Sequence, residues 1–345
     1  MSSHYEAEIL PGLKEYALGE LNERVSEGLK FLSSPREDRI RFSFPADPRR
    51  LLTLRTVVAV YLLKCFAVPR PRALLGDQAF AGLLEGIQQA LALNPAGAFD
   101  SFRISAAGRD SSVMRRISDS IAEASGLRHD DREGALLLRI IPGADRKSWE
   151  VLVRLTPRPL ATRPWRVCDM PGALNATIAA AMLRIIPPGP QEKFLNLMCG
   201  SGTLMIERKL QGSQGLLCGG DISTVALQLS RRNTLAAGAA QTFRLCRFDA
   251  RNLPFADESF DILCADLPWG ERVGKRSANK ELYRRTLLEA ARVIKPSGIL
   301  MMVTQEHRLL SDLLSENPAL WSMQHKLRVF QGGYHPHVYF LRREA

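Results

Sequence analysis

Four consecutive residues, Asp266, Leu267, Pro268 and Trp269, offer a carboxylate, a backbone carbonyl, a rigid turn and a flat aromatic face. They follow the largely apolar run Phe260–Ala265, which is typical of a buried strand. An exocyclic amine on a nucleic-acid base is a poor nucleophile, because its lone pair is delocalised into the ring. The Asp266 carboxylate and the Leu267 carbonyl could accept hydrogen bonds from the N–H groups, which would make that lone pair available. Trp269 would stack on a base taken out of its helix. These residues favour methyl transfer to a base amine.

A glycine-rich turn follows another apolar run. Its candidate ligand-binding residues are Asn196, Met198, Cys199, Gly200, Ser201, Gly202 and Thr203. Glycines let the backbone pass close to a ligand, and the first N–H groups of the following helix are free to bind it. A dinucleotide fingerprint would need a third glycine where Met205 stands, and a P-loop would need Gly-Lys-Ser/Thr, which is absent. Taken alone, the turn fits a purely structural role equally well.

Two more carboxylates end apolar runs at matching places, Asp221 before Ile222 and Asp249 before Ala250. The first can accept both hydroxyl hydrogens of a ribose, and the second can accept from an adenine amino group. Because the carboxyl ends of parallel strands meet at one edge of an open α/β sheet, all four sites would surround one ligand. The combination predicts S-adenosylmethionine as the cofactor.

The elements that must position these residues alternate regularly along the second half of the chain. Helices are predicted at 174–186, from 203, at 223–236 and at 279–294, and strands at 193–198, 215–220, 243–248, 260–265 and 298–304. Two last strands, 327–330 and 338–342, flank Gly332-Gly333. This pattern predicts a Rossmann-like class I methyltransferase sheet that closes with an antiparallel hairpin.

The first half of the chain predicts a separate α+β module. Strands are expected at 5–10, 39–44, 65–68, 101–106, 136–141 and 149–155, and helices at 13–22, 51–63, 78–93 and 112–125. A stiff linker rich in Pro and Arg, residues 157–166, would separate this module from the rest. We therefore expect an N-terminal module over 1–156 and a methyltransferase domain over 167–345.

The charge of the chain favours a polyanionic partner. The formal net charge is +11 over 345 residues. Residues 1–160 hold 23 Lys and Arg against 20 Asp and Glu, whereas residues 161–345 hold 24 against 16. Six cysteines form no C-x-x-C pair, and the sequence shows neither a signal peptide nor an apolar run of membrane-spanning length. We expect a soluble, cytoplasmic and monomeric protein that binds a nucleic acid and holds no metal.

Several segments resemble one family, the THUMP-domain RNA guanine-N2 methyltransferases. Asn196–Glu207 resembles their cofactor block, and Asp266–Gly270 resembles a variant of their catalytic motif. Pro157–Val167 resembles the arginine-bearing link that follows a THUMP domain, and Leu174–Ala180 resembles the helix before the cofactor loop. Glu8–Leu21 resembles the start of their N-terminal ferredoxin-like domain. The resemblance covers nearly the whole chain and is more specific in the second half.

The resemblance implies an enzyme that grips the acceptor end of tRNA with its ferredoxin-like and THUMP module and methylates a stem guanosine at N2. By position, Gly200, Ser201 and Gly202 would face the methionine part of S-adenosylmethionine. Asp221 would bind its ribose, Asp249 its adenine, Thr177 its amino-acid end, and Asp266 with Trp269 the target base. The chain departs from the family where Asn196 and Leu197 replace an acidic residue and a proline.

Three other functions stay open at this point. Related rRNA guanosine-N2 methyltransferases share both modules. Methylation of a DNA base is compatible with the four-residue motif, although the THUMP-like half argues against it. An RNA-binding protein with an inactive methyltransferase fold is favoured only by Asn196, which lacks the charge that would pair with the ammonium group of the cofactor.

Overall fold

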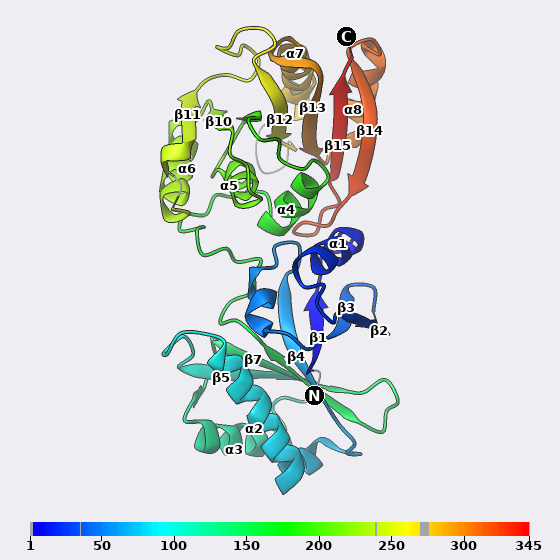
Figure 1. Ribbon diagram of the computed structural model, residues 1–345, viewed down its shortest axis with the longest axis vertical. Coiled ribbons are helices and arrows are strands. Elements are labelled where there is room, and N and C mark those ends of the chain that lie inside the picture. Colours follow the sequence, from blue (N-terminus) through cyan, green and yellow to red (C-terminus); the bar gives the residue numbers. More distant parts are fainter. Residues whose placement is uncertain (1–2, 35, 239, 270–275, 345) are drawn as a thin grey trace. The chain divides into compact units, whose positions relative to one another are not determined.

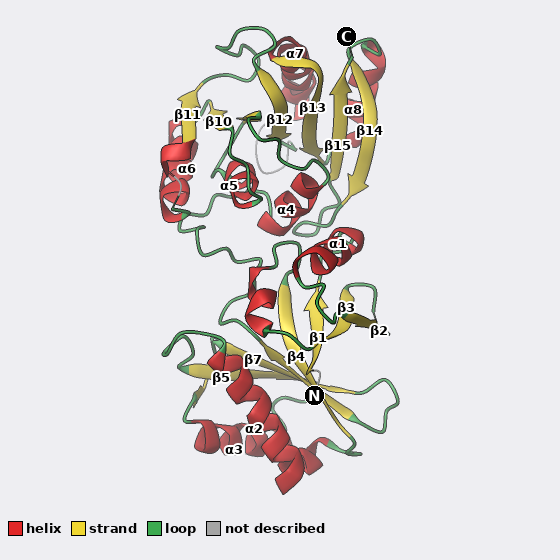
Figure 2. Cartoon of the chain, in the orientation of Figure 1, coloured by secondary structure: helices red, strands yellow, loops and turns green. Residues whose placement is uncertain are grey.

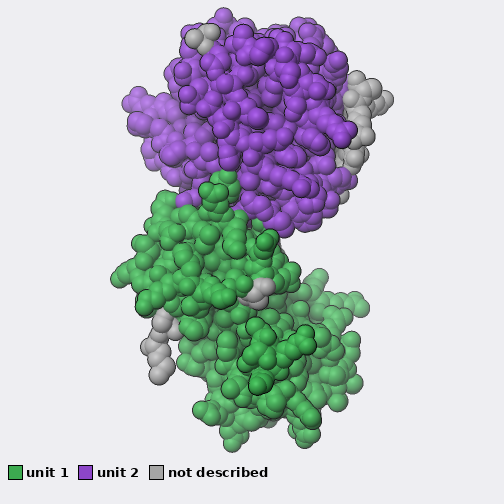
Figure 3. Space-filling view, turned by 90° about the vertical axis from the view of Figure 1, so that its right-hand side faces the viewer, with its two compact units in different colours: residues 1–10, 14–161 green, residues 11–13, 162–345 purple. Residues whose placement is uncertain are grey.

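The computed structural model describes residues 3–34, 36–238, 240–269 and 276–344. The chain divides into two compact units, coloured separately in Figure 3. Unit 1 holds residues 1–10 and 14–161, and unit 2 holds residues 11–13 and 162–345. Among the described residues, no helix is both long and apolar enough to cross a membrane.

Unit 1 is built on one eight-stranded sheet with the strand order β2-β3-β1-β4-β8-β7-β5-β6. Its strands are β1 (Ser3–Glu8), β2 (Lys30–Leu32), β3 (Arg39–Phe44), β4 (Ala59–Phe66), β5 (Ser101–Ala106), β6 (Arg128–His129), β7 (Leu136–Pro142) and β8 (Trp149–Arg154). Its α-helices are α1 (Lys14–Arg24), α2 (Asp77–Ala92) and α3 (Ser112–Ser125). Most pairs are antiparallel, whereas β5 runs parallel to both β6 and β7. The unit is therefore of the α+β kind (Figure 2).

The helix predicted at residues 51–63 is wrong. The segment forms a short 3-10 helix, Pro48–Thr53, followed by strand β4. This strand lies inside the sheet between β1 and β8, so its residues from Ala59 to Leu63 are buried on both faces. An apolar run buried on both faces has no alternation, and its periodicity cannot separate strand from helix. The β-branched and aromatic residues Val57, Val58, Val60 and Tyr61 were the signal for a strand.

Unit 2 is built on a seven-stranded sheet with the strand order β11-β10-β9-β12-β13-β15-β14. Its strands are β9 (Lys193–Leu197), β10 (Leu216–Asp221), β11 (Phe243–Arg247), β12 (Phe260–Asp266), β13 (Ile294–Thr304), β14 (Trp321–Arg328) and β15 (His337–Arg343). Pairs from β11 to β13 are parallel, whereas β15 lies antiparallel between β13 and β14 (Figure 1). The parallel sheet with a closing antiparallel hairpin is confirmed.

Helices cover both faces of this sheet, so its central strands are buried throughout. The helices are α4 (Ala176–Arg184), α5 (Thr203–Leu210), α6 (Thr224–Ala236), α7 (Arg276–Val293) and α8 (His307–Glu316). Arg208 of α5 lies over Phe194 of β9, whereas the neighbouring residue Leu195 packs in one cluster with residues of α7 and α8. Successive residues of a strand point to opposite faces, so α5 lies on one face and α7 with α8 on the other. Helix α8 was not predicted from the sequence, and β14 begins six residues before the predicted start of that strand.

Two buried ion pairs fix α5 in unit 2. Arg208 donates to Glu192, just before β9, and Arg163 donates to Glu207 at 2.9 Å. Both arginines are almost fully buried. A buried charge without a partner is costly, so these pairs tie α5 to β9 and to the segment that enters unit 2. The glycine-rich turn before α5 is therefore joined to a helix whose position is fixed.

Candidate active site

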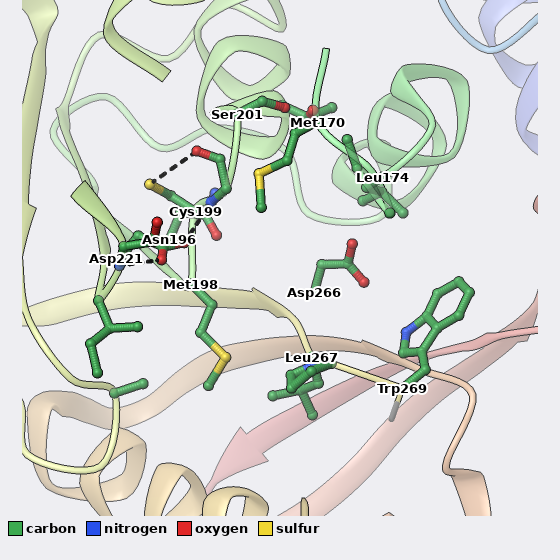
Figure 4. Close-up of a pocket in the computed structure, with 18 of the residues that line it drawn as sticks. Met170, Leu174, Asn196, Met198, Cys199, Ser201, Asp221, Asp266, Leu267 and Trp269 are labelled. Atoms are coloured by element: carbon green, nitrogen blue, oxygen red, sulfur yellow. Dashed lines mark hydrogen bonds between the residues drawn. The ribbon is translucent and has the colours of Figure 1, made fainter. Parts of the chain in front are cut away.

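A pocket of about 620 Å³ opens at the carboxyl-terminal edge of the unit 2 sheet. Its lining comes from the residues that follow β9, β10, β11 and β12, from the loop 170–174, from α7 and from the turn between β14 and β15. This volume is typical of sites for small-molecule ligands and cofactors. Of the residues named from the sequence, all except Thr177 and Gly202 line this one pocket (Figure 4).

The turn after β9 has an unusual backbone. Met198, Gly200 and Gly202 have φ angles of +52°, +54° and +87°, in the left-handed region that favours glycine. Left-handed backbone angles at a methionine reduce the stability of the fold, and residues with such strained angles cluster at ligand sites. The Cys199 N–H donates to the Gly220 carbonyl at 2.8 Å, which ties the turn to β10. The turn is thus held open toward the pocket.

Gly202 supports this turn without lining the pocket. It is the N-cap residue of α5, and a Cβ atom there would lie 2.6 Å from the Ser230 hydroxyl oxygen. Only glycine therefore fits between the turn and α6. Thr177 also lies outside the pocket lining, because its side chain is fully buried within α4.

Asp221 is fixed by the backbone of the same turn. Its carboxylate accepts from the Gly200 N–H at 3.0 Å and from the Ser223 N–H at 2.9 Å. The next residue, Ile222, lines the pocket with 57% of its surface exposed. A carboxylate held at the end of a strand, beside an exposed apolar side chain, can bind a ribose together with the ring attached to it.

Asn196 is satisfied by backbone carbonyls. With its amide turned to suit its surroundings, the nitrogen donates to the carbonyls of Leu197 and Cys264 at 3.1 and 3.2 Å. A carboxylate could not donate to these two oxygens and would be repelled by them. Asn196 therefore suits this buried position, and its amide oxygen is left to accept a hydrogen bond.

Asp249 is already paired within the described structure. Its carboxylate binds the guanidinium of Arg251, with the closest pair of atoms 2.7 Å apart. This hydrogen bond lowers the pKa of Asp249 below its ordinary value. Both residues line the pocket, and Arg251 was not foreseen from the sequence. A ligand amine that binds Asp249 has to share the carboxylate with Arg251.

Asp266 ends β12 as a half-buried residue. Its Oδ1 atom is buried and has no hydrogen-bond partner in the described part of the chain. Burial disfavours the charged form and raises the pKa of Asp266 to about 8. Figure 4 shows this carboxyl group in the open space between Leu174 and Leu267. A buried acceptor of this kind suits a ligand that brings a cation or an N–H group.

Trp269 lines the pocket on the side away from the glycine-rich turn (Figure 4). Its indole ring packs edge to face against Tyr334, with ring centroids 5.8 Å apart. Its Nε1 atom is buried without a hydrogen-bond partner among the residues that the structure describes. The indole therefore offers a ligand both an apolar surface and a donor. Gly270, the last residue of the motif, lies outside the described residues.

Two walls of the pocket were missed from the sequence. The loop 170–174 forms one, and the turn between β14 and β15 forms the other. Gln331 joins them, because its side chain accepts from the Asn175 N–H at 3.0 Å and donates to the Ala173 carbonyl at 3.3 Å. The Pro-Gly and Gly-Gly pairs in these segments predict turns, but nothing in them predicts that the turns meet.

The similarity of this chain to known proteins agrees with the function that the pocket geometry indicates. Residues 163–337 match the model of the RMKL-like methyltransferase domain. A tRNA (guanine(6)-N2)-methyltransferase of Thermus thermophilus is 29% identical, with 98% of this chain and 99% of that protein covered. The mouse tRNA (guanine(6)-N(2))-methyltransferase THUMP3 is 30% identical over 51% of this chain and 37% of its own length. The crystal structure of TrmN from Thermus thermophilus superposes with a TM-score of 0.75, at 27% identity and with 99% of both chains covered.

The buried carboxyl group gives a stability prediction. The pKa of Asp266 rises from 3.8 to about 8 on folding, so between these values the folded protein keeps a proton that the unfolded chain releases. Its contribution to stability therefore falls as pH rises from about 4 to about 8. Asp266→Asn, which is neutral at every pH, should unfold at a Tm several degrees above wild type at pH 8, and the gain should vanish near pH 4.

Asp261 of the same strand provides the opposite control. Burial acts to raise its pKa, but hydrogen bonds from the Lys295 ammonium and the Lys193 N–H outweigh burial and lower it. Asp261→Asn should therefore destabilise the protein at neutral pH, with the difference lost in acid. Calorimetry from about pH 2 to pH 8 measures both effects, because the Asp261 contribution is lost below about pH 4 and the Asp266 contribution changes between about pH 4 and 8. Equal slopes for Asp266→Asn and wild type would contradict a buried, proton-holding Asp266.

Proposed function

The chain belongs to the family of RMKL-like methyltransferase domains, and we propose that it methylates the exocyclic N2 amine of a guanosine in the acceptor stem of tRNA. The observation that carries this proposal is the motif from Asp266 to Trp269, which places in one pocket an aromatic face and a carboxyl oxygen, Asp266 Oδ1, that has no partner among the described residues. The substrate is supported by the relatives named tRNA (guanine-N2)-methyltransferases, one of which matches nearly the whole chain.

The pocket suits S-adenosylmethionine as the methyl donor. Its amino-acid end would lie against the turn of Met198, Cys199 and Ser201, its ribose against Asp221, and its adenine near Asp249. The strained backbone of the turn and the prearranged Asp221 carboxylate fit such a ligand. When bound, S-adenosylmethionine supplies an electrophilic methyl group on a positively charged sulfur.

Asp266 and Leu267 would hold the target amine. The Asp266 carboxylate and the Leu267 carbonyl can each accept one N–H hydrogen, which turns the nitrogen lone pair toward the methyl group. Asp266 would be ionised beside a bound cation, because a nearby positive charge lowers its pKa. Once that charge has gone, burial again favours the protonated form, so Asp266 can take the proton that the amine loses.

We also propose that unit 1 is a THUMP-containing RNA-binding module, with the linker at 157–166 leading to the methyltransferase domain. Two observations support this. The likeness to TrmN covers 99% of both chains and so includes unit 1, and one of the tRNA (guanine-N2)-methyltransferase relatives is named THUMP3. The division between the units falls after Ala161, within that linker. An RNA partner also agrees with the net charge of +11.

The cytoplasm is the proposed location, and a monomer the proposed state. The support for the first is chemical. All six cysteines are free thiols, four of them buried, as expected in a reducing compartment.

The first test is the product itself. Total tRNA from cells that lack this protein should be missing one N2-methylguanosine, found by mass mapping, and purified protein with S-adenosylmethionine should restore it. Asp266→Ala should abolish transfer while RNA affinity changes less than about twofold, because one carboxyl group contributes little to a phosphate-binding surface. Restoration of the nucleotide by Asp266→Ala at the wild-type rate would rule out the mechanism.

Replacement of Trp269 tests the aromatic face. Trp269→Ala should cost about 1–3 kcal/mol of base stacking, which is roughly a 5- to 150-fold loss of kcat/KM on tRNA. Trp269→Phe keeps a stacking face and should recover most of this loss. The affinity for S-adenosylmethionine, measured by calorimetry, serves as the control and should stay close to wild type. An alanine variant with unchanged kcat/KM would exclude stacking on Trp269.

Salt tests the nature of the partner. If lysine and arginine side chains grip phosphates, the logarithm of tRNA affinity should fall linearly with the logarithm of salt concentration, by about 0.9 per phosphate contact. Filter binding between 50 and 200 mM KCl measures this slope. A flat response would argue against a phosphate-gripping surface.

A further inference from the structure

We infer that Tyr283 is a positioning residue for methyl transfer, because it holds the Pro268 carbonyl and thereby aims the Leu267 carbonyl at the target amine. The inference rests on the proposed function and adds a residue outside the pocket to it. Tyr283 lies on α7, is fully buried, and does not line the pocket. It therefore acts through the backbone of the motif and touches neither ligand.

The hydroxyl group of Tyr283 has two close partners. Its Oη atom is 2.8 Å from the Pro268 carbonyl oxygen and 2.7 Å from the Thr304 Oγ1 atom. A carbonyl can only accept, so the Tyr283 proton goes to Pro268, and Thr304 has to donate to Tyr283. Thr304 in turn accepts from the Glu306 N–H at 2.9 Å. The hydrogen bonds form a chain with one direction, in which each bond polarises and strengthens the next.

A second donor reaches the same carbonyl. The Asn279 side-chain nitrogen donates to the Pro268 oxygen at 3.1 Å, and Asn279 is almost fully buried. Both lone pairs of that oxygen are thus occupied by donors from α7. Helix α7 therefore fixes the peptide that links Pro268 to Trp269.

The other side of the motif is fixed by β13. The Leu267 N–H donates to the Val303 carbonyl at 3.0 Å. Between this anchor and the Pro268 anchor lies the Leu267 carbonyl, on which no hydrogen bond from a described residue ends. Proline locks its own φ angle, so the backbone between the anchors has little freedom. The carbonyl is left as a rigid, unused acceptor at the pocket.

Such rigidity affects the rate more than the binding. A reacting group displaced by about 1 Å can cost roughly 100-fold in rate, because the near-attack geometry is lost. Loss of the Tyr283 hydroxyl leaves the pocket lining and the stacking face in place. We therefore expect kcat to fall while binding of both ligands is retained.

The experiment compares two conservative variants of the full chain. Y283F removes the hydroxyl that binds Pro268, and Y339F removes a hydroxyl from the same buried cluster, where Tyr339 donates to the His307 carbonyl at 3.3 Å. We expect Y283F to lower the single-turnover methylation rate about 10- to 100-fold, with Kd for S-adenosylmethionine and for tRNA within twofold of wild type. The rate of Y339F should stay within twofold of wild type, although its Tm should change by about as much as the Tm of Y283F.

A double-variant cycle adds a second measurement. Asn279 lines the pocket and shares the Pro268 oxygen with Tyr283, so each donor can partly replace the other. The combined Y283F and N279A variant should therefore lose more rate than the product of the two single losses.

Three results would overturn the inference. The first is a Y283F rate within twofold of wild type, the second is equal rate losses in Y283F and Y339F, and the third is a loss that appears in Kd with kcat unchanged. A wild type that methylates no RNA would instead overturn the proposed function, and this inference with it. The wild-type measurement thus separates failure of the function from failure of the positioning role.

Discussion

One constraint governs unit 2: the Asp266 Oδ1 atom is buried at the end of β12 with no hydrogen-bond partner among the described residues. Burial raises the pKa of Asp266 to about 8, which is a cost that folding has to offset elsewhere. The offset comes from the strands on either side and from helices on both faces, which leave the residues Leu263–Ala265 fully buried. A carboxyl group kept in this state is ready for a cationic ligand or an amine, and the rest of the pocket surrounds it.

The groups around Asp266 divide into those that contact ligands and those that hold other groups. Backbone N–H groups hold Asp221, carbonyl groups hold Asn196, and α7 holds the motif carbonyl at Pro268. In each case a polar group at the edge of the sheet, either a side chain or a backbone carbonyl, is fixed by neighbours that a ligand would not displace. Preorganised acceptors need little rearrangement during reaction, and this lowers the barrier to transfer.

Much of unit 2 follows from local sequence, because strand ends, glycines and carboxylates fall at fixed intervals along the chain. Most pocket residues between Asn196 and Trp269 could be found this way, although Arg251 could not. The loop 170–174 and Gln331 could not, since their meeting depends on side-chain contacts between segments about 160 residues apart. Strand β4 was missed because burial on both faces removes the alternation that identifies a strand, and Tyr283 because a buried tyrosine in a helix looks like ordinary core.

The position of β15 has a consequence for how the chain is made. Strand β15, residues His337–Arg343, lies between β13 and β14, although both precede it in the sequence. While a ribosome is still synthesising the chain, β13 and β14 therefore present open edges, which other chains could pair with. The turn that carries Gln331 and Tyr334 can settle only when β15 arrives. The wall of the pocket beside Trp269 is thus among the last parts of a newly synthesised chain to fold.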